Sequence, residues 1–170
     1  MQKIMLALVL LVACSAYAFA GDTDFRGATW GMTADECYDT EKFKSGITKE
    51  DYDELKFKGM LFGYVANISY QFKENKLYQG SVIIYTTDRN DAEKIFAAIT
   101  EKISSKSSRE EKVDLFHTVF YVQHTEVSIG ILSNGQNHVV VAGYRMLDLE
   151  SIGLGKYADK PVSDKDLEGF

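Results

Sequence analysis

Apolar residues recur at every second position between residues 62 and 73, which is the period of a β-strand with one buried face. The apolar parity carries Phe62, Tyr64, Ala66, Ile68, Tyr70 and Phe72. A turn at 74–76 leads into a second strand over 77–86, which is apolar on both parities. One parity holds Leu77, Ile83 and Tyr85, and the other holds Tyr78, Val82 and Ile84. We therefore expect this strand to be central and covered on both faces.

Two helices are predicted from their caps. Thr33 and Glu36 have the spacing of a capping box, before a helix that extends to about Lys44. Met32 and Cys37 flank this cap at the spacing of a hydrophobic staple. Asp88 or Asn90 caps a second helix with one apolar face. That face consists of Ala92, Ile95, Phe96, Ile99 and Ile103.

The remaining strands are predicted from alternation and turn chemistry. Leu55 and Phe57 indicate a short strand closed by Gly59, and three more strands are expected over about 113–123, 125–132 and 138–146. A two-residue turn at Asn134–Gly135 places Ile131 opposite His138. A tight turn at His124–Thr125 places Phe120 opposite Ile129, on the same apolar face.

These elements predict the α+β class: a single domain with a largely antiparallel sheet of about five to six strands and two helices packed on one face. The domain is expected over residues 21–146. Residues 147–170 form a C-terminal tail, partly disordered, with Leu149, Ile152 and Leu154 as its anchors.

Residues 1–20 have the plan of a secretory signal peptide: Lys3, an apolar run over 4–13, and small residues that end at Ala20. The apolar run is too short to span a membrane. We expect cleavage between Ala20 and Gly21. The alternative is lipidation of Cys14, because Leu11–Cys14 also fits a bacterial lipobox. Either route predicts an exported protein of the periplasm or cell envelope, with no transmembrane span.

The chain has 19 basic and 25 acidic residues and a net charge of −6, and loss of Lys3 makes the charge more negative. Such a charge argues against nucleic acid and anionic membranes as partners. Cys37 would be the one cysteine left after cleavage, which excludes an intramolecular disulfide in the mature chain. With 45% hydrophobic residues, the chain has enough apolar side chains to build a core without staples.

The residues that could act in catalysis or bind a metal do not indicate an enzyme. The predicted register directs His117 and His138 to opposite faces and leaves His124 at a distant hairpin, so we expect no metal site. Cys37 has acidic neighbours and occupies a staple position, so we expect a buried, inert thiol. No hydrolase, zinc-protease, phosphate-loop or dinucleotide motif occurs, and we expect no catalytic residue and no cofactor.

The segment Trp30-Gly31-Met32-Thr33-Ala34-Asp35-Glu36, followed by Ile68–Phe72 and Lys76–Tyr78, resembles a group of exported bacterial proteins of unknown function. Those proteins begin with a Trp-Gly-Met-Ser/Thr-x-x-Glu segment. The Gly-Met-Thr start is more distantly similar to the small lipoprotein of the outer-membrane β-barrel assembly machinery and to β-lactamase-inhibitor-like domains. The resemblance covers the N-terminal half and implies a non-catalytic envelope module.

The leading functional hypothesis is an exported, non-catalytic module that binds a protein or peptide partner. The polar parity of the first long strand is the candidate binding surface, at Val65, Asn67, Ser69 and Gln71; the segment from Leu147 is a second. The alternative is a carrier that holds a small apolar ligand between sheet and helices, lined by Tyr64, Tyr70, Phe72 and Phe96. A hydrolase with an unrecognised site is the least favoured hypothesis.

Overall fold

The computed structural model describes residues 25–41 and 53–157. In these ranges the chain forms one domain with a seven-stranded, entirely antiparallel sheet, in the order β1-β2-β3-β7-β6-β5-β4. The α+β class is confirmed. The elements are α2 (Ala34–Thr40), β1 (Glu54–Leu61), β2 (Tyr64–Lys73), β3 (Lys76–Thr86), α3 (Arg89–Ser104), β4 (Arg109–Asp114), β5 (His117–Val122), β6 (Thr125–Asn134), β7 (Asn137–Met146) and the 3₁₀ turn η1 (Gly155–Tyr157).

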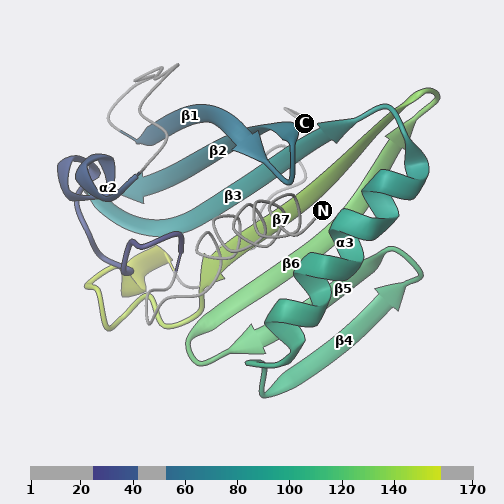
Figure 1. Ribbon diagram of the computed structural model, residues 1–170. Helices are drawn as coiled ribbons and strands as arrows, with labels where there is room; N and C mark the ends of the chain where they lie inside the picture. The colour runs from purple at the N-terminus through teal and green to yellow at the C-terminus, as the bar shows by residue number, and fades with distance from the viewer. Residues whose placement is uncertain (1–24, 42–52, 158–170) are drawn as a thin grey trace, which may run out of the picture.

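The sheet consists of two meanders, β1–β3 and β4–β7, which α3 links in the chain (Figure 1). β3 pairs with β7, so the two meanders join into one continuous sheet. Figure 1 shows α3 lying over the sheet, nearly along the direction of its strands, and the helix contacts β3, β5, β6 and β7. The shorter α2 contacts β1 and β3.

The sheet has more strands than the five to six expected. The predicted strand over 113–123 is two strands, because a turn at Leu115–Phe116 separates β4 from β5. Every residue of β4 is exposed, and five of its six residues are charged. A strand with no buried face carries no apolar alternation, which is why the sequence pattern missed it.

The expectation that β3 is covered on both faces was wrong. The register between β2 and β3 shifts between Gln71 and Phe72, which leaves Tyr78 as an extra residue in β3. The bulge places Leu77 on the same face as Val82 and Ile84, and all three are fully buried. Tyr85, on the other face, is 44% exposed. β3 is thus interior in the sheet, with one buried face.

Two hairpin registers differ from those expected, each by two residues. Ile131 pairs with Val140 and not with His138, because the turn residues are Gly135 and Gln136. Phe120 pairs with Val127 and not with Ile129. The turn there is Gln123–His124, with Gln123 at a positive φ of 52°. A shift of two keeps every side chain on its predicted face, so the apolar face was still assigned correctly.

The first hairpin also differs from its prediction. β1 continues through Gly59 to Leu61, and Phe62 lies in the following turn and not in a strand. Phe62 and Gly63 have φ values of 54° and 83°, which is the backbone of a two-residue hairpin turn. The alternation after this turn is confirmed, since Ala66, Ile68, Tyr70 and Phe72 are all buried.

The core lies between one face of the sheet and the segments packed on it; we call this side the core face. α3 buries Ala92, Ile95, Ile99 and Ile103, with Phe96 partly buried. Asp88 is its N-cap and accepts hydrogen bonds from the backbone N–H groups of Asn90 and Asp91. Burial of this face supplies most of the helix's stability, since propensity alone supports only marginal helices of this length.

The capping box of α2 is confirmed, with the Thr33 backbone N–H donating to Glu36 Oε2 at 2.8 Å. The helix ends at Thr40, earlier than expected, because Glu41 has an extended ψ of 132°. The start of the predicted tail packs on the domain: Leu154 is 1% exposed, and Lys76 Nζ donates to the Ile152 carbonyl at 2.7 Å. The rest of the tail, 158–170, lies outside the described residues.

Candidate binding surface

The residues predicted to form a binding surface lie on the side of β2 that faces away from the core. Val65 is 41% exposed, Asn67 is exposed, and Ser69 and Gln71 are partly exposed. We call this side of the sheet the open face. The antiparallel registers align residues of neighbouring strands in rows across it, so its composition follows directly from the strand pairing.

One row on the open face is apolar across five strands, and we call it the apolar row. It runs from β1 to β6 through Met60, Val65, Tyr85, Val139 and Leu132, where Val65 and Tyr85 each lie one residue beyond the paired Ala66 and Ile84. Four of these side chains are among the seven large hydrophobic residues exposed in the described ranges. A contiguous exposed apolar row is uncommon on a protein without a partner and is typical of an interaction site.

The next two rows are flatter and more polar. The second row is Lys58, Asn67, Ile83, Val141 and Gly130. The third is Lys56, Ser69, Ser81, Gly143 and Ser128. Ser69 Oγ and Ser81 Oγ lie 3.0 Å apart and share a hydrogen bond, and Gly143 adds no side chain. The third row is therefore a low floor beside the taller apolar row.

Parts of these three rows line a groove of about 1020 Å³, which Met60 and Val65 adjoin in the apolar row without lining it. Its lining includes Asn67, Ser69 and Gln71 of the predicted surface, together with Ile83, Tyr85, Val139, Val141 and Leu132. Asn67 Nδ2 donates to the Tyr85 hydroxyl at 3.0 Å, which holds the ring of Tyr85 at the groove's wall. An apolar centre with a rim of amides and hydroxyls is the usual composition of a protein interface.

Charge on the open face is confined to its margins. Lys56 Nζ pairs with Glu54 at 3.0 Å, and Arg145 pairs with Glu126 through two contacts of 2.9 and 3.0 Å. Lys58 also lines the groove, and it forms no ion pair with any described residue. The groove thus carries an uncompensated positive charge at its β1 end, in a chain of net charge −6.

The sequence pattern identified one strand of this surface and missed the other four. Tyr85 was assigned to a covered face because the bulge at Tyr78 was not foreseen. Val139 and Leu132 lie beside it only because β7 pairs with β3, which is a long-range contact. Alternation within each strand signals an outward position, but the order of strands in the sheet determines which outward residues adjoin.

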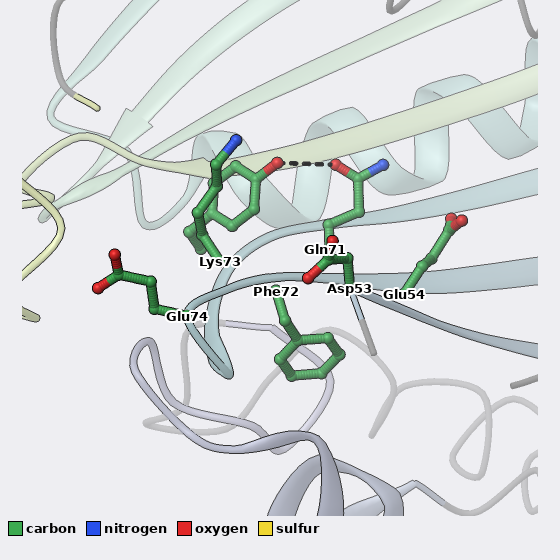
Figure 2. Close-up of a pocket in the computed structure, with 7 residues that line it drawn as sticks. Asp53, Glu54, Gln71, Phe72, Lys73 and Glu74 are labelled. Atoms are coloured by element: carbon green, nitrogen blue, oxygen red, sulfur yellow. Dashed lines mark hydrogen bonds between the residues drawn. The ribbon is translucent and has the colours of Figure 1, made fainter. Parts of the chain in front are cut away.

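A smaller pocket of about 390 Å³ lies near the β2–β3 hairpin and is lined by Asp53, Glu54, Gln71, Phe72, Lys73, Glu74 and Tyr78 (Figure 2). Figure 2 shows Glu54 and Glu74 at opposite ends of it. Both carboxylates have lysine partners, Lys56 and Lys156 respectively. Within residues 25–41 and 53–157, no group of three His, Cys, Asp or Glu side chains is arranged to hold a metal ion.

The histidines are spread over the sheet. His117 Nε2 lies 2.9 Å from Ser128 Oγ on the open face. His138 is 9% exposed on the core face, with Nδ1 2.8 Å from Ser133 Oγ. His124 lies in the exposed β5–β6 turn. The structure therefore does not bring these three predicted candidates together.

Cys37 is fully buried in α2, as expected. Desolvation, and secondarily the negative charge of Glu36, raises the pKa of its thiol to about 12. The nucleophilic form of cysteine is the thiolate, which such a pKa suppresses at neutral pH. This geometry supports a structural thiol.

A buried ion pair lies on the core face where the N-terminal segment meets α2. Arg26 donates from Nε and Nη2 to the two carboxylate oxygens of Glu41 at 2.9 and 3.0 Å, and the two side chains are 5% and 1% exposed. The Tyr70 hydroxyl donates to the same carboxylate at 2.7 Å, and burial raises the pKa of Tyr70. The sequence pattern did not indicate this cluster, since its members are far apart in the chain.

The residues considered for a small-ligand site are part of packed structure. Tyr70 is fully buried, and its ring packs edge-on against Phe25 and Phe57, with centroids 5.0 and 5.6 Å away. Phe72 is 2% exposed, and the Tyr64 hydroxyl donates to Asp91. This packing supports a core role for the aromatic parity of β2.

Cys14, Ala20 and Gly21 lie outside the described residues. None of the described helices is both long enough and apolar enough to cross a bilayer. Comparison of the chain with protein-family models, with curated proteins and with solved structures finds no match, so the geometry of the open face is the main guide to its function.

Proposed function

We propose that this protein is an exported, non-catalytic module of the periplasm or cell envelope that binds a protein or peptide partner on its open face. The observation that carries the proposal is the apolar row from Met60 to Leu132, beside a groove of about 1020 Å³. In this proposal both helices pack on the core face, which leaves the open face available to a partner.

The composition of the groove supports a polypeptide partner. Its uncharged polar groups are amides and hydroxyls, which match the hydrogen-bonding groups of a peptide, and its apolar side chains supply the area that drives association. A catalytic site would require a nucleophile, acid or base in reach of the groove. The residues that line it include serines, Tyr85 and Lys58, but no histidine that could activate them and no cysteine, and the one carboxylate in the lining, Glu54, is engaged by Lys56.

Export is part of the proposal and rests on the signal-like first twenty residues. The resemblance of the Trp-Gly-Met-Thr segment to exported proteins supports the same compartment. The negative net charge supports a protein partner over nucleic acid or an anionic membrane surface.

Photo-cross-linking from the groove tests the proposal in the exported protein. A photoreactive residue replaces Val139, in a chain that also carries either Val65→Glu or the matched control Val113→Glu. Both valines are exposed strand residues, at 41% and 59%, but Val113 lies on β4, away from the groove. We expect one cross-linked partner, lost with Val65→Glu and retained with Val113→Glu.

The cross-linked partner is then purified and titrated against the chain. Binding should weaken at least about tenfold with Val65→Glu, which corresponds to about 1.4 kcal/mol. Equal cross-linking in both variants, or equal affinity for both, would show that the open face is not the binding surface.

A further inference from the structure

We infer that the partner presents an amphipathic α-helix of about four turns, which lies across the strands along the apolar row with a carboxylate directed at Lys58. This inference rests on the proposed function and specifies the partner's chemistry. The juxtaposition that carries it is the alignment of five apolar side chains, one per strand, beside Lys58 of β1, which has no carboxylate partner among the described residues.

The spacing of the apolar row matches a helix better than an extended peptide. Neighbouring strands lie about 4.8 Å apart, so the five side chains span about 19 Å. A helix returns an apolar position to one side about every 5.4 Å, or about 22 Å over four turns. An extended chain returns to one side about every 6.7 Å, or about 27 Å over four repeats. Its length therefore exceeds that of the apolar row by more than the spacing between two strands.

The profile of the open face also suits a helix. Successive rows on one face of a strand are about 6.7 Å apart, so a helix about 10 Å wide covers the apolar row and the second row together. Beyond Asn67, the second row consists of Ile83, Val141 and Gly130, which are apolar or lack a side chain. The third row, with Ser81 and Gly143, is low enough to leave the helix's flank unobstructed.

The charge of Lys58 predicts an acidic residue at one end of the partner helix. The Lys58 ammonium stands at the β1 end of the second row without a described carboxylate partner. The β6 end of that row, Gly130, carries no charge. A partner carboxylate at the β1 end would therefore meet an opposite charge, whereas a cation there would be repelled.

Three fluorescent 16-residue peptides test the inference by anisotropy titration against the chain from Gly21. The first is helical, with an apolar stripe and glutamates at one end. The second replaces those glutamates with lysines. The third has the composition of the first but alternates apolar and polar residues, so that it favours an extended chain. We expect the first peptide to bind at least about tenfold more tightly than either other.

Chain variants assign the contacts. Lys58→Glu should reverse the preference between the acidic and basic helices, whereas the matched control Lys106→Glu should not, because Lys106 is an exposed lysine beyond the end of α3. Raising the salt concentration should reduce the difference in affinity between the acidic and basic helical peptides, because salt screens the charge of Lys58. Val65→Glu should weaken both.

The outcomes separate this inference from the proposed function. Equal binding of the helical and alternating peptides overturns the helix, and an unchanged preference in Lys58→Glu overturns the carboxylate contact. Failure of all three peptides to bind overturns the inference as a whole. In each case the proposed function is tested separately: a partner that cross-links to position 139, and no longer does so in Val65→Glu, would still support the open face as a binding surface.

Discussion

The ring of Phe25 lies directly over Gly80, and no side chain fits between the two residues. A Cβ at position 80 would lie 2.4 Å from two ring carbons. The ring also packs against the rings of Tyr70 and Tyr144, whose centroids are each 5.0 Å away. Because Phe25 is 1% exposed, this contact fastens the N-terminal segment to the interior strand β3.

Gly80→Ala should therefore lower the free energy of unfolding by about 1–3 kcal/mol, the usual cost of overpacking a core. Urea denaturation of the chain from Gly21 measures the change. Gly143→Ala is the matched control, because the nearest atom to its Cβ, the Ser128 carbonyl oxygen, is 4.0 Å away. Equal destabilisation by the two substitutions would contradict the close contact with Phe25.

Glu41→Gln should be strongly destabilising, by about 3–5 kcal/mol, because it leaves the charge of the buried Arg26 without its carboxylate. The chain offers a control of the same chemistry in the Arg145–Glu126 pair, whose side chains are 41% and 23% exposed. Glu126→Gln should cost no more than about 1 kcal/mol. Chemical denaturation compares the two, and similar costs would show that burial does not set the strength of the Arg26–Glu41 pair.

Cys37 should react slowly with a thiol reagent in the folded chain at pH 8, since it is fully buried and the pKa of its thiol is raised to about 12. The measurement is the labelling rate, followed by mass spectrometry with and without denaturant. We expect labelling to require unfolding. Rapid labelling of the native protein would reopen a nucleophilic role for this residue.

The same thiol predicts a loss of stability in alkali. Its pKa is about 9.0 when unperturbed and about 12 in the folded chain, so between these values the unfolded state loses its proton first. The contribution of this thiol to the free energy of unfolding is fully present below about pH 9 and is lost as the pH rises towards 12. The free energy of unfolding should fall less steeply over this window in Cys37→Ala than in the unmodified chain. Parallel slopes would contradict the raised pKa.

Processing of the chain is tested by the intact mass of protein exported from a bacterial host. We expect a mature chain that begins at Gly21, because Ala18-Phe19-Ala20 offers the small residues a signal peptidase requires. Cys14→Ser should leave this mass unchanged. An acylated species that begins at Cys14 would show the lipoprotein route, and a retained Met1 would overturn export.

Local signals in the sequence were enough to predict most elements of the fold. The Thr33–Glu36 capping box, the apolar face of α3 and the alternation of β2 each lie within one short stretch, and the structure shows all three. Two features depended on non-local geometry and were missed. The Tyr78 bulge reverses the faces of the rest of β3, and β4 is held by backbone pairing without burial.

The open face, which we propose as the binding surface, was predicted in part for the same reason. Asn67 and Ser69 follow from the polar parity of a single strand. Their neighbours Ile83 and Val139 follow only from the pairing of β2 with β3 and of β3 with β7. Strand order depends on the whole chain, so no local pattern could have assembled the groove.

The charged outer strands also determine how this sheet can meet other chains. β4 presents Arg109, Glu110, Glu111, Lys112 and Asp114 to solvent, and β1 at the opposite margin carries Lys56 and Lys58. Charged edge strands oppose the addition of another strand, which is the first step towards domain swapping and fibril growth. A partner or a second copy of the chain is therefore expected to dock flat on the open face, because the charged edges disfavour lengthening of the sheet.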